Sequence, residues 1–240
     1  MSFRSAFLIL SCLVISGCTL PRAEISPEGY LEVFGPATSI TKTSLPAEWF
    51  VDGLAETDFL SARLNLVNID GSPTLNLSPA TQSYVFAKRT KASLLATPFL
   101  SWSWNYPAFQ GEEHPVRLIF GFHGGNPKSG SWGSQPLIFL GKKAPPYDRA
   151  ISIIWHRNAF LRGTLNIKSK LAKYIARGGI ENTDKWQTEH IDLAALYRRL
   201  WPKDRHSRVR IMFAGFAATG GTPPTNNAIG AAFADIVLSK

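Results

Sequence analysis

Apolar and polar residues alternate along much of the chain from Trp49 onward. The clearest stretch is residues 98–105 (PFLSWSWN), where Leu100, Trp102 and Trp104 share one side and Ser and Asn residues share the other. Because successive side chains of a strand point to opposite faces of a sheet, this period of two predicts a strand with one buried face. The same pattern predicts strands at residues 60–68, from 75, and at 84–88, 116–123, 150–157, 171–176, 208–214 and 233–238.

One short helix is expected near the end of the chain, at residues 192–201. Asp192 is a suitable N-cap, Leu193, Leu196 and Leu200 recur at helical spacing, and Pro202 would end the helix. Many short strands with a single helix favour an all-β fold, an antiparallel β-sandwich formed by one domain over residues 46–240.

The first residues have the pattern of an export signal. One basic residue, Arg4, precedes an apolar run of about ten residues, which is too short to span a bilayer as a helix. The following ISGC at 15–18 resembles the lipobox of bacterial lipoproteins. This resemblance implies a signal peptide at residues 1–17, cleavage before Cys18 and lipid on Cys18, with residues 18–45 as the lipidated N-terminus and tether. Thr19 is not the Asp that retains many such proteins at the inner membrane, which favours the periplasmic face of the outer membrane in a host with two membranes.

The cysteine count agrees with this interpretation. The chain has two Cys residues, and Cys12 lies inside the segment to be removed, so the mature chain would keep Cys18 alone. No intramolecular disulfide could then form, and apolar burial has to hold the fold, for which 45% hydrophobic residues are an ample supply.

The charge adds a class of partner. A net charge of +9 on an exported protein favours an anionic partner such as lipid head groups or an envelope polymer, whereas export makes nucleic acid an improbable partner. The densest basic stretch, residues 198–210, is either a solvated turn or a surface that docks another envelope protein.

Several stretches together resemble a bacterial family of exported proteins, domain of unknown function 3047. They are PFLSWSW at 98–104, EEHPVRLIF at 112–120, IIW at 153–155, WQTEHID at 186–192 and YRRL at 197–200. The resemblance covers about residues 45–240 and implies a jelly-roll-like sandwich akin to carbohydrate-binding modules. The chain departs from the family in having Glu112-Glu113 for its Asp pair, His190 for an Arg, and no acid in AGFAAT at 214–219.

Catalytic chemistry has few candidates. Glycoside hydrolysis needs two carboxylates across the scissile bond, but adjacent Glu112 and Glu113 on a strand would point to opposite faces. An envelope hydrolase acting through Glu113 with His114, His123 or His156 is kept as the alternative function. A cross-strand pair of His123 and His156 is geometrically possible if their strands are neighbours, although structural histidines are favoured. No helical His pair and no Cys ligand exist, so we expect no metal and no cofactor.

Binding has better candidates. Sugar-binding modules use exposed rings as platforms with polar groups beside them. Trp132 lies in a Gly/Ser loop where a ring has little reason to be buried, so it is either a ligand platform or a loop anchor. Trp102, Trp104 and Trp155 are expected in the core. The polar strand residues Asn105, Arg117 and His156 could line one sheet face.

The sequence therefore predicts a lipid-anchored envelope protein with a non-catalytic binding or structural domain. Its expected ligand is a glycan or another anionic envelope polymer.

Overall fold

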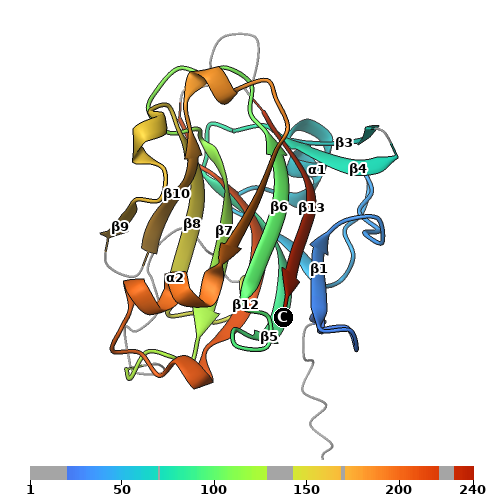
Figure 1. Cartoon of the computed structure of the whole chain (residues 1–240). Coiled ribbons are helices and arrows are strands. Elements are labelled where there is room, and N and C mark those ends of the chain that lie inside the picture. Colours follow the sequence, from blue (N-terminus) through green and yellow to red (C-terminus); the bar gives the residue numbers. More distant parts are fainter. Residues whose placement is uncertain (1–20, 70, 129–142, 169–170, 222–229) are drawn as a thin grey trace, which may run out of the picture.

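The computed structural model describes residues 21–69, 71–128, 143–168, 171–221 and 230–240. They form a jelly-roll-like β-sandwich of two sheets packed face to face (Figure 1). The sheets are mostly antiparallel, so the predicted fold class is confirmed.

The smaller sheet has the strand order β11-β6-β13-β4-β3, with β1 also paired to β13. Its strands are β1 (Tyr30–Phe34), β3 (Leu64–Ile69), β4 (Ser72–Leu77), β6 (Phe99–Asn105), β11 (Gln187–Asp192) and β13 (Ala231–Ser239).

The larger sheet has the order β2-β5-β12-β7-β8-β10-β9, and its β8–β10 pair is parallel. Its strands are β2 (Trp49–Asp52), β5 (Tyr84–Ser93), β7 (Val116–His123), β8 (Arg149–His156), β9 (Leu165–Lys168), β10 (Leu171–Gly178) and β12 (Arg210–Ala218).

Aromatic rings fill the space between the sheets. Trp102 and Trp104 of β6 lie edge to face with ring centroids 5.1 Å apart, and Trp104 lies 5.7 Å from Trp155 of β8. Tyr106 continues the cluster at 5.1 Å from Trp155. All four side chains are fully buried, as the sequence predicted for the three Trp residues.

A second apolar cluster covers part of the outer face of the larger sheet. Phe213 of β12 contacts Phe50 of β2 and Tyr147 in edge-to-face geometry. The buried Arg89 stabilises this cluster, because its guanidinium donates to the backbone oxygens of Trp49 and Lys143 and lies 4.9 Å from the Phe50 ring. The side chains of this cluster therefore cover this part of the outer face of the larger sheet.

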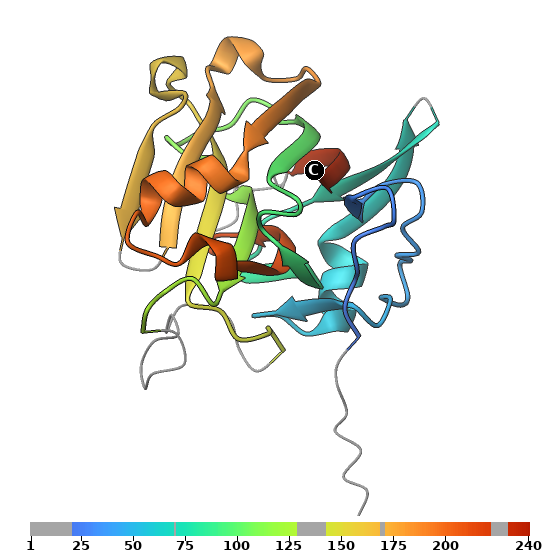
Figure 2. The ribbon, with the colours of Figure 1, turned by 60° about the horizontal axis from the view of Figure 1, so that its bottom comes forward.

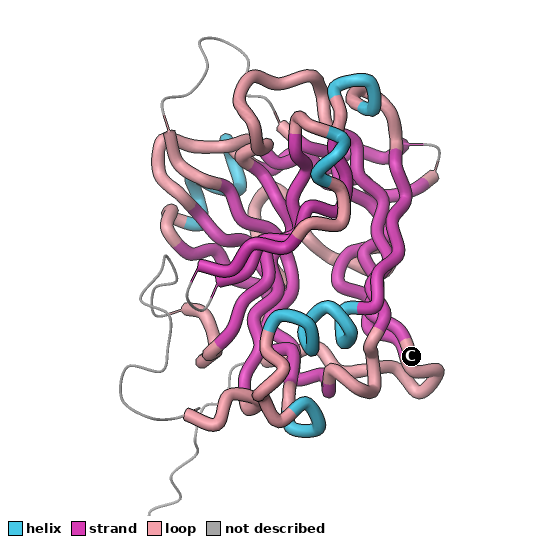
Figure 3. Tube along the Cα trace, turned by 60° about the vertical axis from the view of Figure 1, so that its left-hand side comes forward, coloured by secondary structure: helices cyan, strands magenta, loops and turns pink. Residues whose placement is uncertain are grey.

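The helix α2 (Leu193–Leu200) lies at the lower end of the sandwich, near the ends of both sheets (Figure 3). Asp192 caps it as predicted, since its Oδ1 accepts from the backbone N of Ala195 at 2.7 Å. Its apolar face, including Leu196 and Tyr197, is buried in the main core.

The expectation of a single helix is wrong, because α1 (Glu56–Ala62) occupies the first part of the strand predicted at 60–68. Phe59 of α1 packs on the rings of Tyr84 and Phe86, a tertiary contact that the local alternation does not reveal. Three short 3₁₀ helices complete the described helical residues: η1 (Ala159–Leu161), η2 (Ile180–Asn182) and η3 (His206–Arg208).

The predicted tether is also too long. Residues 30–34, which the sequence assigned to it, form β1 with Leu31, Val33 and Phe34 buried against the sandwich. Further upstream, the backbone N of Ala23 donates to the oxygen of Arg89 at 2.8 Å. The folded domain therefore includes residues well before 46. The sequence did not reveal this strand because five residues between Pro- and Gly-containing turns give only a weak alternating pattern.

No helix in the described part of the chain is long and apolar enough to cross a membrane.

The aromatic core yields a test of stability. Trp104→Ala should lower the free energy of unfolding by about 3–5 kcal/mol, because removing this large buried ring leaves a cavity between the sheets. Trp186→Ala removes a ring that is 38% exposed, and should cost about 1 kcal/mol or less. Urea unfolding of both variants measures the difference, and equal losses would contradict the assigned core.

Candidate functional site

The outer face of the smaller sheet carries polar rows beside exposed aromatic rings. On β6, the residues that alternate with the buried Trp102 and Trp104 are Ser101, Ser103 and Asn105, and each is partly exposed. The neighbouring β11 places Thr188 opposite Ser103, and their hydroxyl oxygens are 3.0 Å apart. The alternation that buries the Trp rings thus builds a hydroxyl-rich surface on the opposite side of the same strand.

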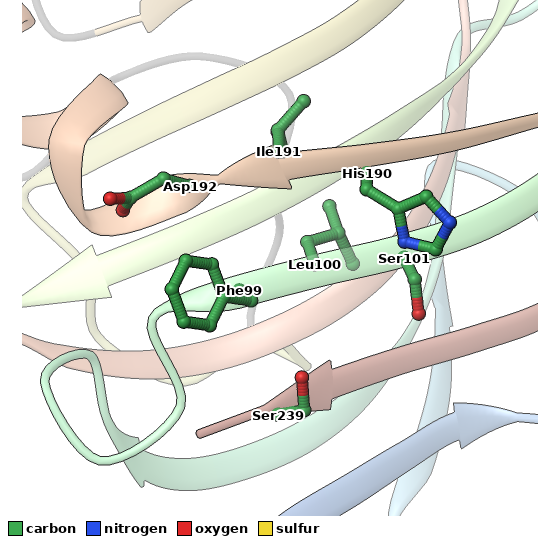
Figure 4. Close-up of a pocket in the computed structure, with 7 residues that line it drawn as sticks. All are labelled: Phe99, Leu100, Ser101, His190, Ile191, Asp192 and Ser239. Atoms are coloured by element: carbon green, nitrogen blue, oxygen red, sulfur yellow. The ribbon is translucent and has the colours of Figure 1, made fainter.

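An open hollow of about 510 Å³ lies at one end of this surface (Figure 4). Strand pairing places Asp192 and Ser239 on either side of Phe99, and His190 opposite Ser101. The hollow is lined by Phe99, Leu100, Ser101, His190, Ile191, Asp192 and Ser239.

The lining combines one ring with several hydrogen-bonding groups. The Phe99 side chain is 46% exposed, so its ring is available to an apolar face of a ligand. The Ser101 and Ser239 hydroxyls can donate and accept, the His190 imidazole can do the same, and the Asp192 carboxylate accepts. This arrangement suits a ligand with alternating apolar and hydroxyl-bearing surfaces.

The binding residues predicted from sequence are not brought together. Asn105 lies on the outer face described above, at the opposite end of β6 from Phe99. Arg117 belongs to β7 of the larger sheet, where its guanidinium contacts the Thr219 hydroxyl and lies 3.8 Å from Glu113. His156 ends β8 and is nearly buried, with its Nδ1 accepting from the backbone N of Asn158 at 2.9 Å. The single face expected for these three residues is therefore wrong, since they belong to two sheets.

Trp132 lies outside the described residues, as does the predicted lipidation site Cys18.

Glu113 and His114 point to different environments. The Glu113 carboxylate faces outward, with Oε2 2.6 Å from the Lys173 Nζ. The His114 ring is fully buried between Tyr106 and Phe109, at centroid distances of 4.4 and 4.9 Å. Burial lowers the pKa of His114 to about 3, and its Nδ1 accepts from the backbone N of Val116. The neutral His114 is therefore a core residue.

His123 lies at the far end of β7 from Glu113 and His114. Its Nδ1 is 3.5 Å from Oδ2 of the buried Asp148. His156 is also distant from it: although β7 and β8 are neighbours, Phe122 pairs with Arg149, so His156 lies eight residues along β8 from the position opposite His123. That offset is roughly 25 Å along the strand, which excludes the cross-strand His pair.

No group of three or more His, Cys, Asp or Glu side chains in the described ranges is arranged to hold a metal ion.

The sequence missed most of the hollow. Phe99, His190, Asp192 and Ser239 come from three strands whose pairing joins distant parts of the chain. The available signal was the polar side of residues 98–105, which identified Ser101 as outward-facing but not its neighbours.

No protein-family model matches the chain, and no curated protein matches it, so the resemblance to domain of unknown function 3047 stays a prediction. Among solved structures, the chain is similar to TmCBM27, a carbohydrate-binding module described for specific mannan recognition, at 13% identity, covering 88% of this chain and 98% of that one, with a TM-score of 0.35. It is also similar to Trichoderma harzianum endoglucanase 3 of family GH12, at 9% identity over 82% and 99% of the chains, with a TM-score of 0.35. A third is the xyloglucanase domain of NopAA from Sinorhizobium fredii, at 10% identity over 80% and 93%, with a TM-score of 0.35. These likenesses are too distant to assign a ligand or an activity.

The burial of His114 makes a pH prediction. Because its folded-state pKa of about 3 lies below the ordinary value near 6.5, protonation favours the unfolded chain. The stability that the neutral ring contributes is present above about pH 6.5 and is lost as pH falls toward 3, by about 1.4 kcal/mol per pH unit. His114→Gln should reduce the slope of the unfolding free energy against pH in this range by the equivalent of about one proton. Urea unfolding at several pH values checks it, and parallel profiles for the two proteins would contradict it.

Proposed function

We propose that this protein is an exported, lipid-anchored, non-catalytic glycan-binding protein of the bacterial envelope. Its ligand lies in the hollow on the outer face of the smaller sheet. The observation that carries the proposal is the exposed Phe99 ring among hydroxyl, imidazole and carboxylate groups.

The chemistry of the hollow favours a sugar. A pyranose ring has apolar C–H patches on its faces and hydroxyl groups around its edge. Phe99 supplies a flat apolar surface for one face, and Ser101, His190 and Ser239 supply donors and acceptors for the edge. The hydroxyl pair of Ser103 and Thr188 extends the polar row along the strands, so a chain of several sugars would find further partners.

Binding without hydrolysis fits the charge of the site. Glycoside hydrolysis uses two carboxyl groups on either side of the scissile bond. Asp192 supplies the one carboxylate among the described residues that line the hollow, and one of its oxygens already caps α2. Glu113, the acid of the alternative hydrolase, lies on a loop leading into the larger sheet and is paired with Lys173.

Phe99→Ala should weaken glycan binding about tenfold, because stacking on an aromatic ring contributes about 0.5–1.5 kcal/mol beyond burial of its area. The matched control is Phe160→Ala, which removes a ring that is 96% exposed on η1. Titration calorimetry against a panel of envelope glycans measures both variants, with thermal unfolding as the check of folding. Equal binding by Phe99→Ala and the unmodified protein, or no binding to any glycan of the panel, would overturn the proposal.

The membrane anchor has a separate test. Cys18→Ser should abolish incorporation of a labelled fatty acid and release the protein from membranes washed in high salt, since two or more acyl chains are needed for stable anchoring and salt screens binding by surface charge. Cys12→Ser, within the predicted signal peptide, should leave both unchanged. Incorporation of the labelled fatty acid by Cys18→Ser, or its retention on salt-washed membranes, would contradict the lipid anchor.

A further inference from the structure

A strongly basic surface occupies one end of the sandwich. It is formed by the last turn of α2, the segment that follows through η3, and the first residue of β12, at the lower end of the molecule in Figure 1 and turned toward the viewer in Figure 2. This basic end carries six exposed cationic residues: Arg198, Arg199, Lys203, Arg205, Arg208 and Arg210.

The acid of this segment is removed from its surface. Asp204 is buried, and its two carboxylate oxygens accept from the Arg149 guanidinium at 3.0 Å each. The Tyr197 hydroxyl donates to the same carboxylate at 2.7 Å. Asp204 therefore neutralises an internal arginine and leaves the six surface cations uncompensated within their own segment.

The segment that presents the cations is held by the core. The buried Trp201 lies against Arg149 at 5.3 Å, and the backbone N of Arg205 donates to the oxygen of Gly125 at 2.7 Å. Over the described ranges, none of the six cations forms an ion pair. A fixed array of unpaired cations fits a polyanionic surface better than a single anion.

An exposed apolar side chain lies beside the array. Leu95, 48% exposed, follows β5 in the turn where the backbone N of Leu94 donates to the oxygen of Val209. An aliphatic side chain among cations suits the boundary between lipid head groups and acyl chains, whereas a soluble acidic polymer offers it no apolar environment.

The N-terminal segment joins the domain near the same end. Ala23 pairs with Thr90, three residues before Ser93, which pairs with Arg210. Cys18 is five residues before Ala23, so a lipid on Cys18 would reach at most about 18 Å from that point. The exposed Glu24 offsets part of the charge of the joining segment but lies outside the array.

From these observations we infer that the basic end binds anionic phospholipid head groups and docks the domain on the membrane in one orientation. The position of the lipid rests on the proposed anchor, whereas the charged array and Leu95 do not. A polybasic surface supplies the second signal that makes acyl anchoring stable, and each cation near an anionic surface strengthens binding about fivefold.

The test uses the full chain made without export, so that Cys18 carries no lipid. Co-sedimentation measures its partition onto vesicles of phosphatidylcholine alone or of phosphatidylcholine and phosphatidylglycerol in equal parts. We expect binding to be much tighter with phosphatidylglycerol, and the double variant Arg205→Gln/Arg208→Gln to lose about 25-fold of that binding. The apolar N-terminal run is the same in every protein, so differences between variants report on the folded domain.

The matched control is Arg157→Gln/Lys185→Gln, which removes the same charge from exposed residues at the other end of the sandwich. It should change binding less than about fivefold, which corresponds to one cation. Equal losses for the two double variants, or no gain from phosphatidylglycerol, would overturn the inference. Tighter binding to soluble polyglutamate than to the anionic vesicles would also overturn it, in favour of an acidic polymer. None of these outcomes bears on the Cys18 fractionation test, so the two proposals fail separately.

Discussion

Packing of aromatic rings between the two sheets is the constraint on which the rest of this structure depends. The described residues contain no cysteine, so burial of Trp102, Trp104 and Trp155 has to fix the distance and register of the sheets. Because side chains alternate along a strand, burying the two Trp rings of β6 forces the residues between them to the outside. A slip of one residue would exchange the two faces of β6, and it would place serines in the core and tryptophans in solvent. The packing that buries Trp102 and Trp104 thus also turns Phe99 and Ser101 of the hollow outward.

The basic end depends on the same core through α2. Helical periodicity places Leu196, Tyr197 and Leu200 against the sandwich and leaves Arg198 and Arg199 on the opposite side. Tyr197 then contributes to burying Asp204. Desolvation, together with this hydrogen bond to Asp204, raises the pKa of the Tyr197 hydroxyl. A carboxylate that would have neutralised the surface is used to pair Arg149 inside the molecule. The strong surface charge therefore follows from the way in which the end of the sandwich is closed.

The local sequence pattern correctly predicted features that depend on neighbouring residues in the chain. The strand at 116–123 has the predicted bounds, the Trp residues are buried, and Asp192 caps the second helix. Pattern failed where contacts distant in sequence decide the outcome. Asn105 and Arg117 were expected on one sheet face, but strand pairing places them in different sheets and leaves the Arg117 side chain only 11% exposed. The sequence offered His114 as a partner of Glu113 in the alternative hydrolase, yet Tyr106 and Phe109 enclose its ring. Phe99 could be placed on a strand, whereas its neighbours Asp192 and Ser239 become visible only once β6 is known to lie between β11 and β13.

The two proposed surfaces constrain each other. Phe99 and Asp192 lie at the end of their strands from which α2 departs, so the hollow is close to the basic end but belongs to the side of the sandwich. A domain docked through its basic end leaves this side open to solvent, because the strands run away from that end. Docking through the outer face of the smaller sheet would instead cover Phe99 and the hydroxyl rows. Membrane binding and glycan binding are therefore compatible in the orientation that the unpaired cations favour, which would hold the ligand beside the lipid surface.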